Sequence, residues 1–255
     1  MSFASKVAII TGASSGIGRA AAIAFSTSGA SVVAVGREKP ALEATLAELG
    51  QGQNPALAVV ADLTSTEAAA TVVGAAIERF GGIDILVNAA GMIGFGSTDQ
   101  TTDEQWDAMM DLNVRAPFRL MRAAFPHLQA RRGTVVNVSS VNGRRVFPGL
   151  AAYNTSKAAV DQLTRCAAID WAPHGVRVNA VNPGVTVTNL HRRAGLDEEK
   201  YAAFLARSKE THPLGRPGQA SEIASLIVFL ASDGAEWITG ETIAIDGGRH
   251  LTCAR

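Results

Sequence analysis

Short runs of β-branched residues alternate with longer alanine-rich stretches along the whole chain. The runs are nearly continuous in apolar residues, which is typical of parallel strands that helices cover on both faces. Between the first two runs, Ile17, Ala21 and Phe25 belong to an apolar stripe with the spacing of a helix packed on a sheet. The predicted strands are 7–10, 31–35, 56–60, 83–87, 134–138, 176–181 and 242–245. Repeated strand–helix–strand units predict an α/β fold with a doubly wound parallel sheet.

Length and composition favour one domain. The chain has 255 residues, of which 47% are hydrophobic and 18% charged, enough to build a sizeable core. Linkers, low-complexity stretches and internal repeats are absent from the sequence. We therefore expect residues 1–255 to form a single domain.

Charge and hydropathy exclude several classes of protein. The 23 basic and 23 acidic residues cancel, whereas a nucleic-acid or anionic-membrane surface needs a basic excess. No apolar run approaches the roughly 20 residues that span a bilayer. Two cysteines are too few for a disulfide framework, and the scattered histidines show no metal-binding spacing. Residues 1–6 lack the apolar region of a signal peptide. We expect a cytoplasmic protein that binds no nucleic acid, membrane or metal.

The first predicted strand ends in a glycine-rich turn, Thr11-Gly-Ala-Ser-Ser-Gly-Ile-Gly18, and a helix follows. Glycines permit close approach of the backbone to a ligand, and the N-terminus of the helix presents unpaired N–H groups to a pyrophosphate. The spacing is Gly-x-x-x-Gly-x-Gly, so an ordinary strand–helix turn remains an alternative. The position of the turn in the first β-α-β unit favours dinucleotide binding.

Polar residues follow the later strands, where open α/β sheets bind their ligands. They are Asp62-Leu63, Asn88-Ala-Ala-Gly91, Ser139-Ser140 and Asn182-Pro-Gly184. Tyr153 and Lys157 come near the start of a predicted helix over 151–171. Four residues apart, they share one face with Cβ atoms roughly 5–6 Å apart. Taken alone, this pair is also explained as an ordinary surface pair.

Together these segments resemble the short-chain dehydrogenase/reductase family over essentially the whole chain. Thr186 departs from the family pattern, since an aliphatic residue is common at its position. The interval of 13 residues from Ser140 to Tyr153 also fits the family. The matching residues are 11–18, 88–91, Asn113, Ser140, the Tyr153-Asn-Thr-Ser-Lys157 segment, 182–184 with Thr188, and 246–248. The resemblance implies a Rossmann fold with a seven-stranded parallel sheet, a homotetramer, and interconversion of a small carbonyl compound and a secondary alcohol with NAD(P).

Catalysis of this kind needs a proton donor and acceptor. A free tyrosine has a pKa of about 10, and lowering it to near 7 takes roughly 4 kcal/mol. A neighbouring ammonium is one way to supply this energy, and Lys157 fits. The resemblance implies that Lys157 also holds the nicotinamide ribose, that Tyr153 is the general acid or base, and that Ser140 donates to the substrate oxygen. It further implies that Asn113 anchors a water molecule that relays protons to Lys157.

Alternatives exist for several of these residues. Ser139 could replace Ser140 as the active serine, and Asn113 could only satisfy backbone groups. Residues 64–67, Thr-Ser-Thr-Glu, predict a capping box at the start of a helix, and Asp62 could cap that helix or bind adenine. Two further predictions concern packing: Cys166 should lie in the core, as should the helically spaced Trp106, Met109 and Met110.

The end of the second strand predicts a preference for NADP(H), with NAD(H) as the other possible cofactor. A carboxylate there would bind both ribose hydroxyls, but this chain has Gly36 and then Arg37, whose guanidinium suits a 2′-phosphate. Lys39 adds charge, whereas Glu38 opposes it. The expected cofactor-binding residues are Gly12, Ser14, Ser15, Gly16, Ile17, Gly18, Arg37, Asp62, Leu63, Asn88, Ala89, Gly91, Tyr153, Lys157, Pro183, Gly184, Thr186 and Thr188.

The stretch from 185 to 218 is crowded with charges and bounded by prolines. We predict that residues 188–212 form a mobile lid over the substrate, although a solvated surface helix would show the same pattern. Substrate choice depends on this segment and on loop residues that include Ile93, Phe95, Asn142, Val146 and Phe147.

Two other functions fit parts of the sequence. Arg131 and Arg132 lie near the position at which 3-oxoacyl-(acyl-carrier-protein) reductases dock their acidic carrier, but His174 stands where such enzymes often have arginine. The chain could also be a non-catalytic dinucleotide sensor. Such proteins typically lose the tyrosine or the lysine, and this chain has both Tyr153 and Lys157.

Overall fold

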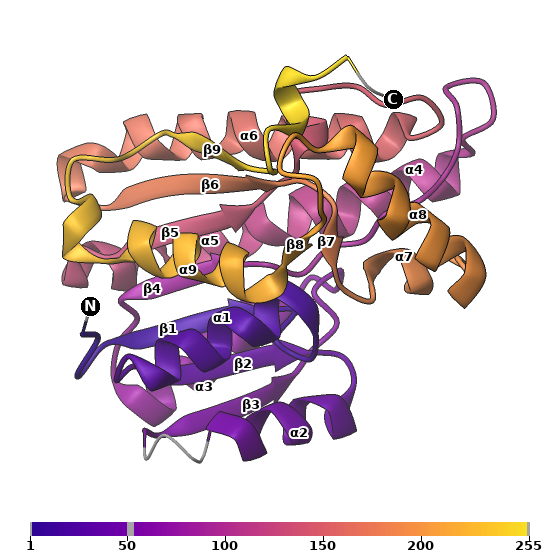
Figure 1. Ribbon diagram of the computed structural model, residues 1–255. Helices are drawn as coiled ribbons and strands as arrows, with labels where there is room; N and C mark the ends of the chain where they lie inside the picture. The colour runs from indigo at the N-terminus through magenta and orange to yellow at the C-terminus, as the bar shows by residue number, and fades with distance from the viewer. Residues whose placement is uncertain (1, 50–53, 254–255) are drawn as a thin grey trace.

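The computed structural model describes residues 2–49 and 54–253. Its centre is a parallel sheet of seven strands in the order β3-β2-β1-β4-β5-β6-β9 (Figure 1). The strands are β1 (Val7–Thr11), β2 (Ser31–Gly36), β3 (Ala56–Val60), β4 (Ile85–Asn88), β5 (Thr134–Val138), β6 (Arg177–Pro183) and β9 (Thr242–Ile245). The order reverses between β1 and β4, which opens a crevice at their carboxyl ends. The predicted doubly wound Rossmann fold is confirmed, and each predicted strand is present to within two residues.

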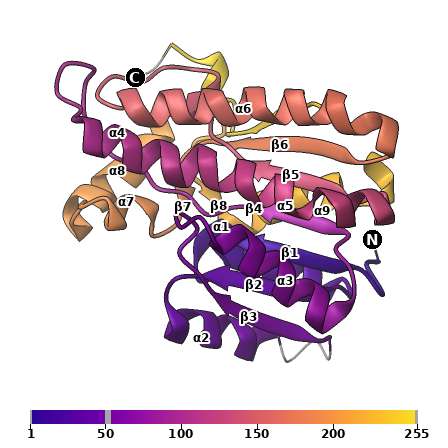
Figure 2. The ribbon, with the colours of Figure 1, turned by 180° about the vertical axis from the view of Figure 1, so that it is seen from behind.

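Helices cover both faces of the sheet. One apolar cluster lies between the sheet and α1, α2 and α9, and a second lies between the sheet and α3, α5 and α6, which are in front in Figure 2. Phe25 and Ala21 of α1 are fully buried, as their helical spacing predicts. The helices are α1 (Gly16–Thr27), α2 (Lys39–Leu49), α3 (Ala68–Phe80), α4 (Asp103–Met110), α5 (Ala116–Arg131), α6 (Ala151–Trp171) and α9 (Ala220–Ala231).

A smaller layer lies beyond the carboxyl ends of the strands. It contains α7 (Leu190–Arg193) and α8 (Glu198–Thr211), flanked by β7 (Thr186–Val187) and β8 (Gly218–Gln219), which pair in parallel. Figure 1 shows α7 and α8 at the end of the sheet toward which the arrows point. This layer closes one side of the crevice.

The predicted capping box at 64–67 is wrong. Helix α3 begins at Ala68, and its N-cap Glu67 makes no side-chain capping hydrogen bond. Instead, Asp62 Oδ1 accepts hydrogen bonds from the Thr64 backbone N–H at 3.0 Å and from its hydroxyl at 2.8 Å. Aspartate readily closes such a turn, and this turn occupies the Thr64 N–H before a helix can begin. Asp62 is therefore not a helix cap either.

The prediction that Cys166 lies in the core is also wrong, since its side chain is exposed. The buried stripe of α6 passes through Thr164, Ala167 and Ala168, and Cys166 falls on the opposite face. On α4, Met109 is 2% exposed and packs as predicted, whereas Trp106 is 39% exposed.

Candidate active site

A cavity of about 560 Å³ lies at the crevice beyond the strand ends. The glycine turn after β1 and the end of β2 contribute to its wall, as do the start of α6 and helices α7 and α8. Most of the predicted site residues therefore line a cavity at the point where the strand order reverses, between β1 and β4.

The glycine turn is shaped for close contact with a ligand. Gly12 has φ +67°, and a Cβ there would lie 2.9 Å from the carbonyl oxygen of Ala89. A Cβ at Gly18 would lie 2.4 Å from the carbonyl oxygen of Gly12. Thr11 Oγ1 fixes the facing loop by accepting hydrogen bonds from the N–H groups of Ala89 and Ala90, both at 3.0 Å. This bare backbone at the start of α1 fits the pyrophosphate of a dinucleotide.

Helix α6 and the end of β5 bring Ser140, Tyr153 and Lys157 together. All three line the cavity and are less than 10% exposed. Lys157 Nζ lies 5.7 Å from the centroid of the Tyr153 ring and donates a hydrogen bond to the carbonyl oxygen of Val138 at 3.0 Å. The Ser139 hydroxyl donates instead to the carbonyl oxygen of Lys157, so Ser140 is the serine that faces Tyr153.

Burial dominates the acid–base properties of this group. It raises the pKa of Tyr153 above its ordinary value of 10, although a hydrogen bond with Ser140 acts in the opposite direction. Burial also lowers the pKa of Lys157 to about 8, and the negative charge of Asp161 only partly offsets this effect. Burial therefore acts against the expected lowering of the Tyr153 pKa toward 7 by Lys157. Loss of hydration is the largest influence on this pKa.

Asn113 lies in a π-helical turn, Asp111–Arg115, which joins α4 and α5 into one continuous rod. Its Oδ1 accepts from the Met92 N–H at 2.9 Å, and its Nδ2 donates to the Met92 carbonyl oxygen and to Ser156 Oγ, both at 3.0 Å. A Cβ at Gly91 would lie 3.2 Å from Asn113 Oδ1 and 3.6 Å from Lys157 Nζ. Asn113 thus satisfies backbone groups, which is the alternative role that the sequence left open. It also lies close to Lys157. Single π-turns of this kind are frequent at functional sites.

A polar network continues from Ser140 to the loop before α6. The Asn142 N–H donates to Ser140 Oγ at 3.1 Å, and Asn142 Nδ2 donates to Asn154 Oδ1 at 2.7 Å. Asn154 Nδ2 in turn donates to the carbonyl oxygen of Phe147 at 2.9 Å. This network fixes the wall of the cavity next to Ser140 and Tyr153.

Most of the predicted cofactor residues share the cavity. Asp62 and Asn88 are not part of its lining, and Asn88 is buried with its Nδ2 donating to Asn137 Oδ1 at 2.8 Å. The predicted residues that line the cavity are Gly12, Ser14, Ser15, Gly16, Ile17, Gly18, Arg37, Leu63, Ala89, Gly91, Tyr153, Lys157, Pro183, Gly184, Thr186 and Thr188.

Sequence reasoning missed two residues that the fold brings to the site from far along the chain. The buried His212 accepts a hydrogen bond at Nε2 from the Val185 N–H at 3.2 Å, beside Gly184. Arg249, near the C-terminal end, lines the cavity. Neither residue lies in a motif, so their roles depend on tertiary packing alone.

Comparison with known proteins identifies the class. A family model described as enoyl-(acyl carrier protein) reductase matches residues 12–250. The chain is 38% identical to trans-4-hydroxycyclohexanecarboxylate dehydrogenase of Sinomonas cyclohexanicum, covering 96% of this chain and 93% of the relative. It is 36% identical to 3-oxoacyl-(acyl-carrier-protein) reductase of Thermotoga maritima, covering 95% and 97%.

A solved structure agrees with these relatives. A short-chain dehydrogenase/reductase of unknown function from Caenorhabditis elegans, solved with cofactor, is 37% identical with a TM-score of 0.94, covering 98% of this chain and 97% of that one. The chain belongs to the short-chain dehydrogenase/reductase family. It is an oxidoreductase that uses a nicotinamide dinucleotide and acts on an alcohol or carbonyl group.

Two further properties concern only the part of the chain that the structure describes. Among residues 2–49 and 54–253, no three His, Cys, Asp or Glu side chains are grouped so that they could hold a metal ion. In those ranges, no helix combines the length and apolar character needed to cross a membrane.

Proposed function

We propose that the protein is an NADP(H)-preferring oxidoreductase that interconverts a small carbonyl compound and a secondary alcohol, with Tyr153 as the general acid or base. The observation that carries this proposal is the joint placement of Ser140, Tyr153 and Lys157 in the wall of one cavity. A non-catalytic dinucleotide sensor would not need this buried acid–base group.

Ser140 and Tyr153 have separate roles in the proposed reaction. When bound, the nicotinamide supplies or accepts the hydride. Ser140 Oγ donates a hydrogen bond to the substrate oxygen, where negative charge develops. The Tyr153 hydroxyl gives its proton to that oxygen during reduction and takes it back during oxidation. Because burial keeps the pKa of Tyr153 high, its hydroxyl is protonated at neutral pH and ready to act as the acid.

Lys157 and Asn113 complete the proton path. Lys157 holds the nicotinamide ribose, and its hydrogen bond to Val138 keeps it beside Tyr153. The proximity of Asn113 Oδ1 and Lys157 Nζ to the same point above Gly91 supports a water molecule between them. That water would restore the proton that Tyr153 gives up.

The preference for NADP(H) rests on the end of β2. A Cβ at Gly36 would lie 3.3 Å from Ser14 Oγ and from Leu42 Cδ2, so a larger acidic side chain would crowd this point. The exposed Arg37 side chain comes next and lines the cavity. An arginine there stabilises a 2′-phosphate, and no carboxylate at position 36 repels one.

Residues 188–212 form the proposed lid. Thr188 lies against the glycine turn, where a Cβ at Gly16 would lie 3.1 Å from Thr188 Cγ2. Tyr201 of α8 holds this loop, since its hydroxyl donates to the Thr188 carbonyl oxygen at 2.9 Å. Side chains of α7 and α8 line the cavity. Such a segment can close over the substrate and exclude water during hydride transfer.

The assembly and compartment are part of the same proposal: a cytoplasmic homotetramer. Apolar side chains are exposed on α6 and near the C-terminal end, with Ile169 76%, Trp237 100% and Leu251 77% exposed. A tetramer that covers them would remove this surface from water. Sedimentation analysis should give four times the chain mass, and a monomer would contradict it.

The 3-oxoacyl-(acyl-carrier-protein) reductase remains a second candidate because of the Thermotoga maritima relative. Both candidates are tested by one panel of ketones, sugars, steroids and 3-oxoacyl thioesters, with nicotinamide absorbance as the readout. We expect turnover of simple ketones with NADPH. Turnover confined to 3-oxoacyl thioesters would favour the second candidate, and no turnover with any carbonyl compound would contradict both.

A further inference from the structure

Residues 182–188 form a wall of the cavity between the reacting groups and the glycine turn. At one end, Asn182 Nδ2 donates a hydrogen bond to the carbonyl oxygen of Ser140 at 2.8 Å. At the other end, a Cβ at Gly16 of the turn would lie 3.1 Å from Thr188 Cγ2. The residues between these ends that line the cavity are Pro183, Gly184, Val185 and Thr186. With the pyrophosphate at the turn and the reaction at Ser140, the nicotinamide half of the cofactor lies along this wall.

His212, which follows α8, holds the backbone in the middle of this wall. Its Nε2 accepts a hydrogen bond from the Val185 N–H at 3.2 Å. The ring is buried and packs closely, since a Cβ at Gly184 would lie 3.0 Å from His212 Nε2. The Tyr201 hydroxyl accepts from the Thr188 N–H at 3.2 Å. The proposed lid helix and the residue that ends it therefore hold the wall at two points.

The hydrogen bonds fix the tautomer of the His212 ring. Nε2 accepts from a backbone N–H and therefore carries no proton itself. The Thr211 hydroxyl donates to the carbonyl oxygen of Arg207 at 3.1 Å, so its oxygen can accept from His212 Nδ1–H, also at 3.1 Å. Neutral His212 thus uses both ring nitrogens. A second ring proton would lie at Nε2 and place two donors, the ring and the Val185 N–H, against each other.

The surroundings of the ring favour its neutral form. Burial lowers the pKa of His212 below its ordinary value of 6.5, and the positive charge of Arg249 lowers it further. A backbone hydrogen bond with Ser208 and the negative charge of Asp246 act in the opposite direction. Asp246 also accepts a hydrogen bond from the His250 N–H at 2.7 Å. Residues 182–188 contain no titratable side chain, and the last five residues of α8 include Arg207, Lys209 and Glu210. His212 is therefore neutral at pH 7 and gains a proton only in acid.

We propose that His212 is a positioning residue for the cofactor. In its neutral form it holds the Val185 N–H, and with it residues 183–187, in the shape that receives the nicotinamide half. A proton taken up from solvent at Nε2 breaks this hydrogen bond, releases the segment and weakens cofactor binding. This inference rests on the proposed position of the nicotinamide and does not depend on the proposed proton transfer by Tyr153.

Two substitutions separate the hydrogen bond from the charge. His212→Gln keeps an acceptor near the position of Nε2 but does not titrate, whereas His212→Leu has no acceptor. Calorimetry at about pH 7.5 would give the dissociation constant of NADP⁺. It should stay within about twofold of wild type in His212→Gln and rise at least about fivefold in His212→Leu, the value of one hydrogen bond. Binding by His212→Leu as tight as that of wild type would overturn the proposal.

The pH dependence of binding separates positioning from packing alone. Between about pH 7.5 and 5, the dissociation constant of NADP⁺ should rise at least about fivefold more in wild type than in His212→Gln. The comparison cancels the titration of the 2′-phosphate, because a phosphate monoester gains a proton near pH 6 with either protein. An equal pH dependence of the two proteins would overturn the proposal.

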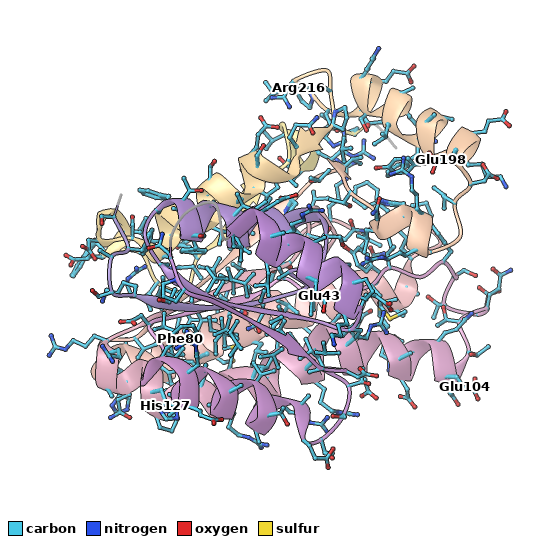
Figure 3. All side chains as sticks on the ribbon, turned by 90° about the horizontal axis from the view of Figure 1, so that it is seen from below. Glu43, Phe80, Glu104, His127, Glu198 and Arg216 are labelled. Atoms are coloured by element: carbon cyan, nitrogen blue, oxygen red, sulfur yellow. The ribbon has the colours of Figure 1, made fainter. Side chains whose placement is uncertain are left out.

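His127→Gln is the matched control, because it removes the same ring elsewhere in the fold. His127 belongs to α5 and is not part of the cavity lining. Figure 3 shows His127 and Glu198, at the start of α8, on opposite sides of the molecule. This variant should keep the pH dependence of wild type. A loss equal to that in His212→Gln would overturn the proposal, because it would show a general effect of histidine charge.

A second measurement needs no substitution of His212. NMR follows the protonation of each histidine ring, and single glutamine variants of the other four histidines assign their signals and leave that of His212. Because cofactor and proton exclude each other, NADP⁺ should lower the pKa of His212. A ring that NADP⁺ leaves unaffected, or that does not titrate above about pH 5, would overturn the proposal even if His212→Gln failed to fold. None of these measurements needs turnover, so their failure would leave the proposed carbonyl reduction standing.

Discussion

Lys157 Nζ donates a hydrogen bond to the carbonyl oxygen of Val138, two residues before the proposed catalytic serine, Ser140, at a distance of 3.0 Å. This bond joins helix α6 to the end of β5, so one lysine fixes the relative positions of Ser140 and Tyr153. It also gives a fully buried cation only a neutral partner at that point. The site is therefore preorganised at a cost in stability.

The burial of this charged lysine predicts that the free energy of unfolding rises with pH above neutrality. The pKa of Lys157 is about 8 in the folded chain, against 10.5 when unperturbed. Below pH 8 the lysine is charged in both the folded and unfolded states, and its burial destabilises the fold. Between pH 8 and 10.5 the unfolded state binds more protons, so stability rises with pH.

The matched variant is Lys157→Met, which keeps the aliphatic stem without the charge. The free energy of unfolding of wild type relative to this variant should rise by about 2 kcal/mol between roughly pH 7.5 and 9.5. Urea unfolding at the two pH values measures this change. A difference that does not depend on pH would show that the lysine titrates normally.

Asn113→Ala should destabilise the fold. The substitution leaves the N–H and carbonyl groups of Met92 without their side-chain partner. Leaving a buried group unsatisfied costs about 1–3 kcal/mol, and because the two Met92 groups are partly buried, a total loss of about 2–4 kcal/mol is expected in chemical denaturation. Unchanged stability would contradict a role of these hydrogen bonds in supporting the fold.

The proposed lid should be the first site of proteolysis. Arg193 ends α7 and is exposed, and the turn to α8 follows it. Limited digestion with trypsin should therefore cut after Arg193 before it cuts within the sheet. Cofactor and substrate together should slow this cleavage. Initial cleavage elsewhere, with no effect of ligands, would contradict the lid.

Arg37→Ala tests the cofactor preference. Wild type should bind NADPH about 10- to 150-fold more tightly than NADH, the value of one charge-assisted contact of about 1.5–3 kcal/mol. The variant should lose most of this preference by weakening NADPH binding alone. Fluorescence titration with both reduced cofactors gives the four constants. Equal loss for NADH would mean that Arg37 stacks on adenine without selecting the cofactor.

The strands and the long helix were predictable because their signals are local. Nearly continuous apolar runs identify covered parallel strands, and the predicted helix over 151–171 matches α6 at both ends. The motifs also located most of the cavity wall, since open α/β sheets place ligands at the strand ends. The capping box at Thr64 failed because Asp62, two residues earlier, competes for the same N–H.

Other features depend on packing that no local pattern reveals. The π-helical turn at Asn113 occurs where Met92 and Ser156 approach the helix from other parts of the chain. Arg249 lines the cavity, and its guanidinium lies over the ring of Phe147, which is about 100 residues earlier in the sequence. The raised pKa of Tyr153 follows from its complete burial, which the sequence does not specify.

The central claim is that Tyr153 transfers the proton, and Tyr153→Phe tests it most directly. The variant removes one oxygen and keeps the ring that packs beside Lys157. With a ketone that wild type reduces, kcat should fall at least about 100-fold, while the dissociation constant for NADPH stays within about twofold. Turnover close to that of wild type, with NADPH still bound, would contradict the account.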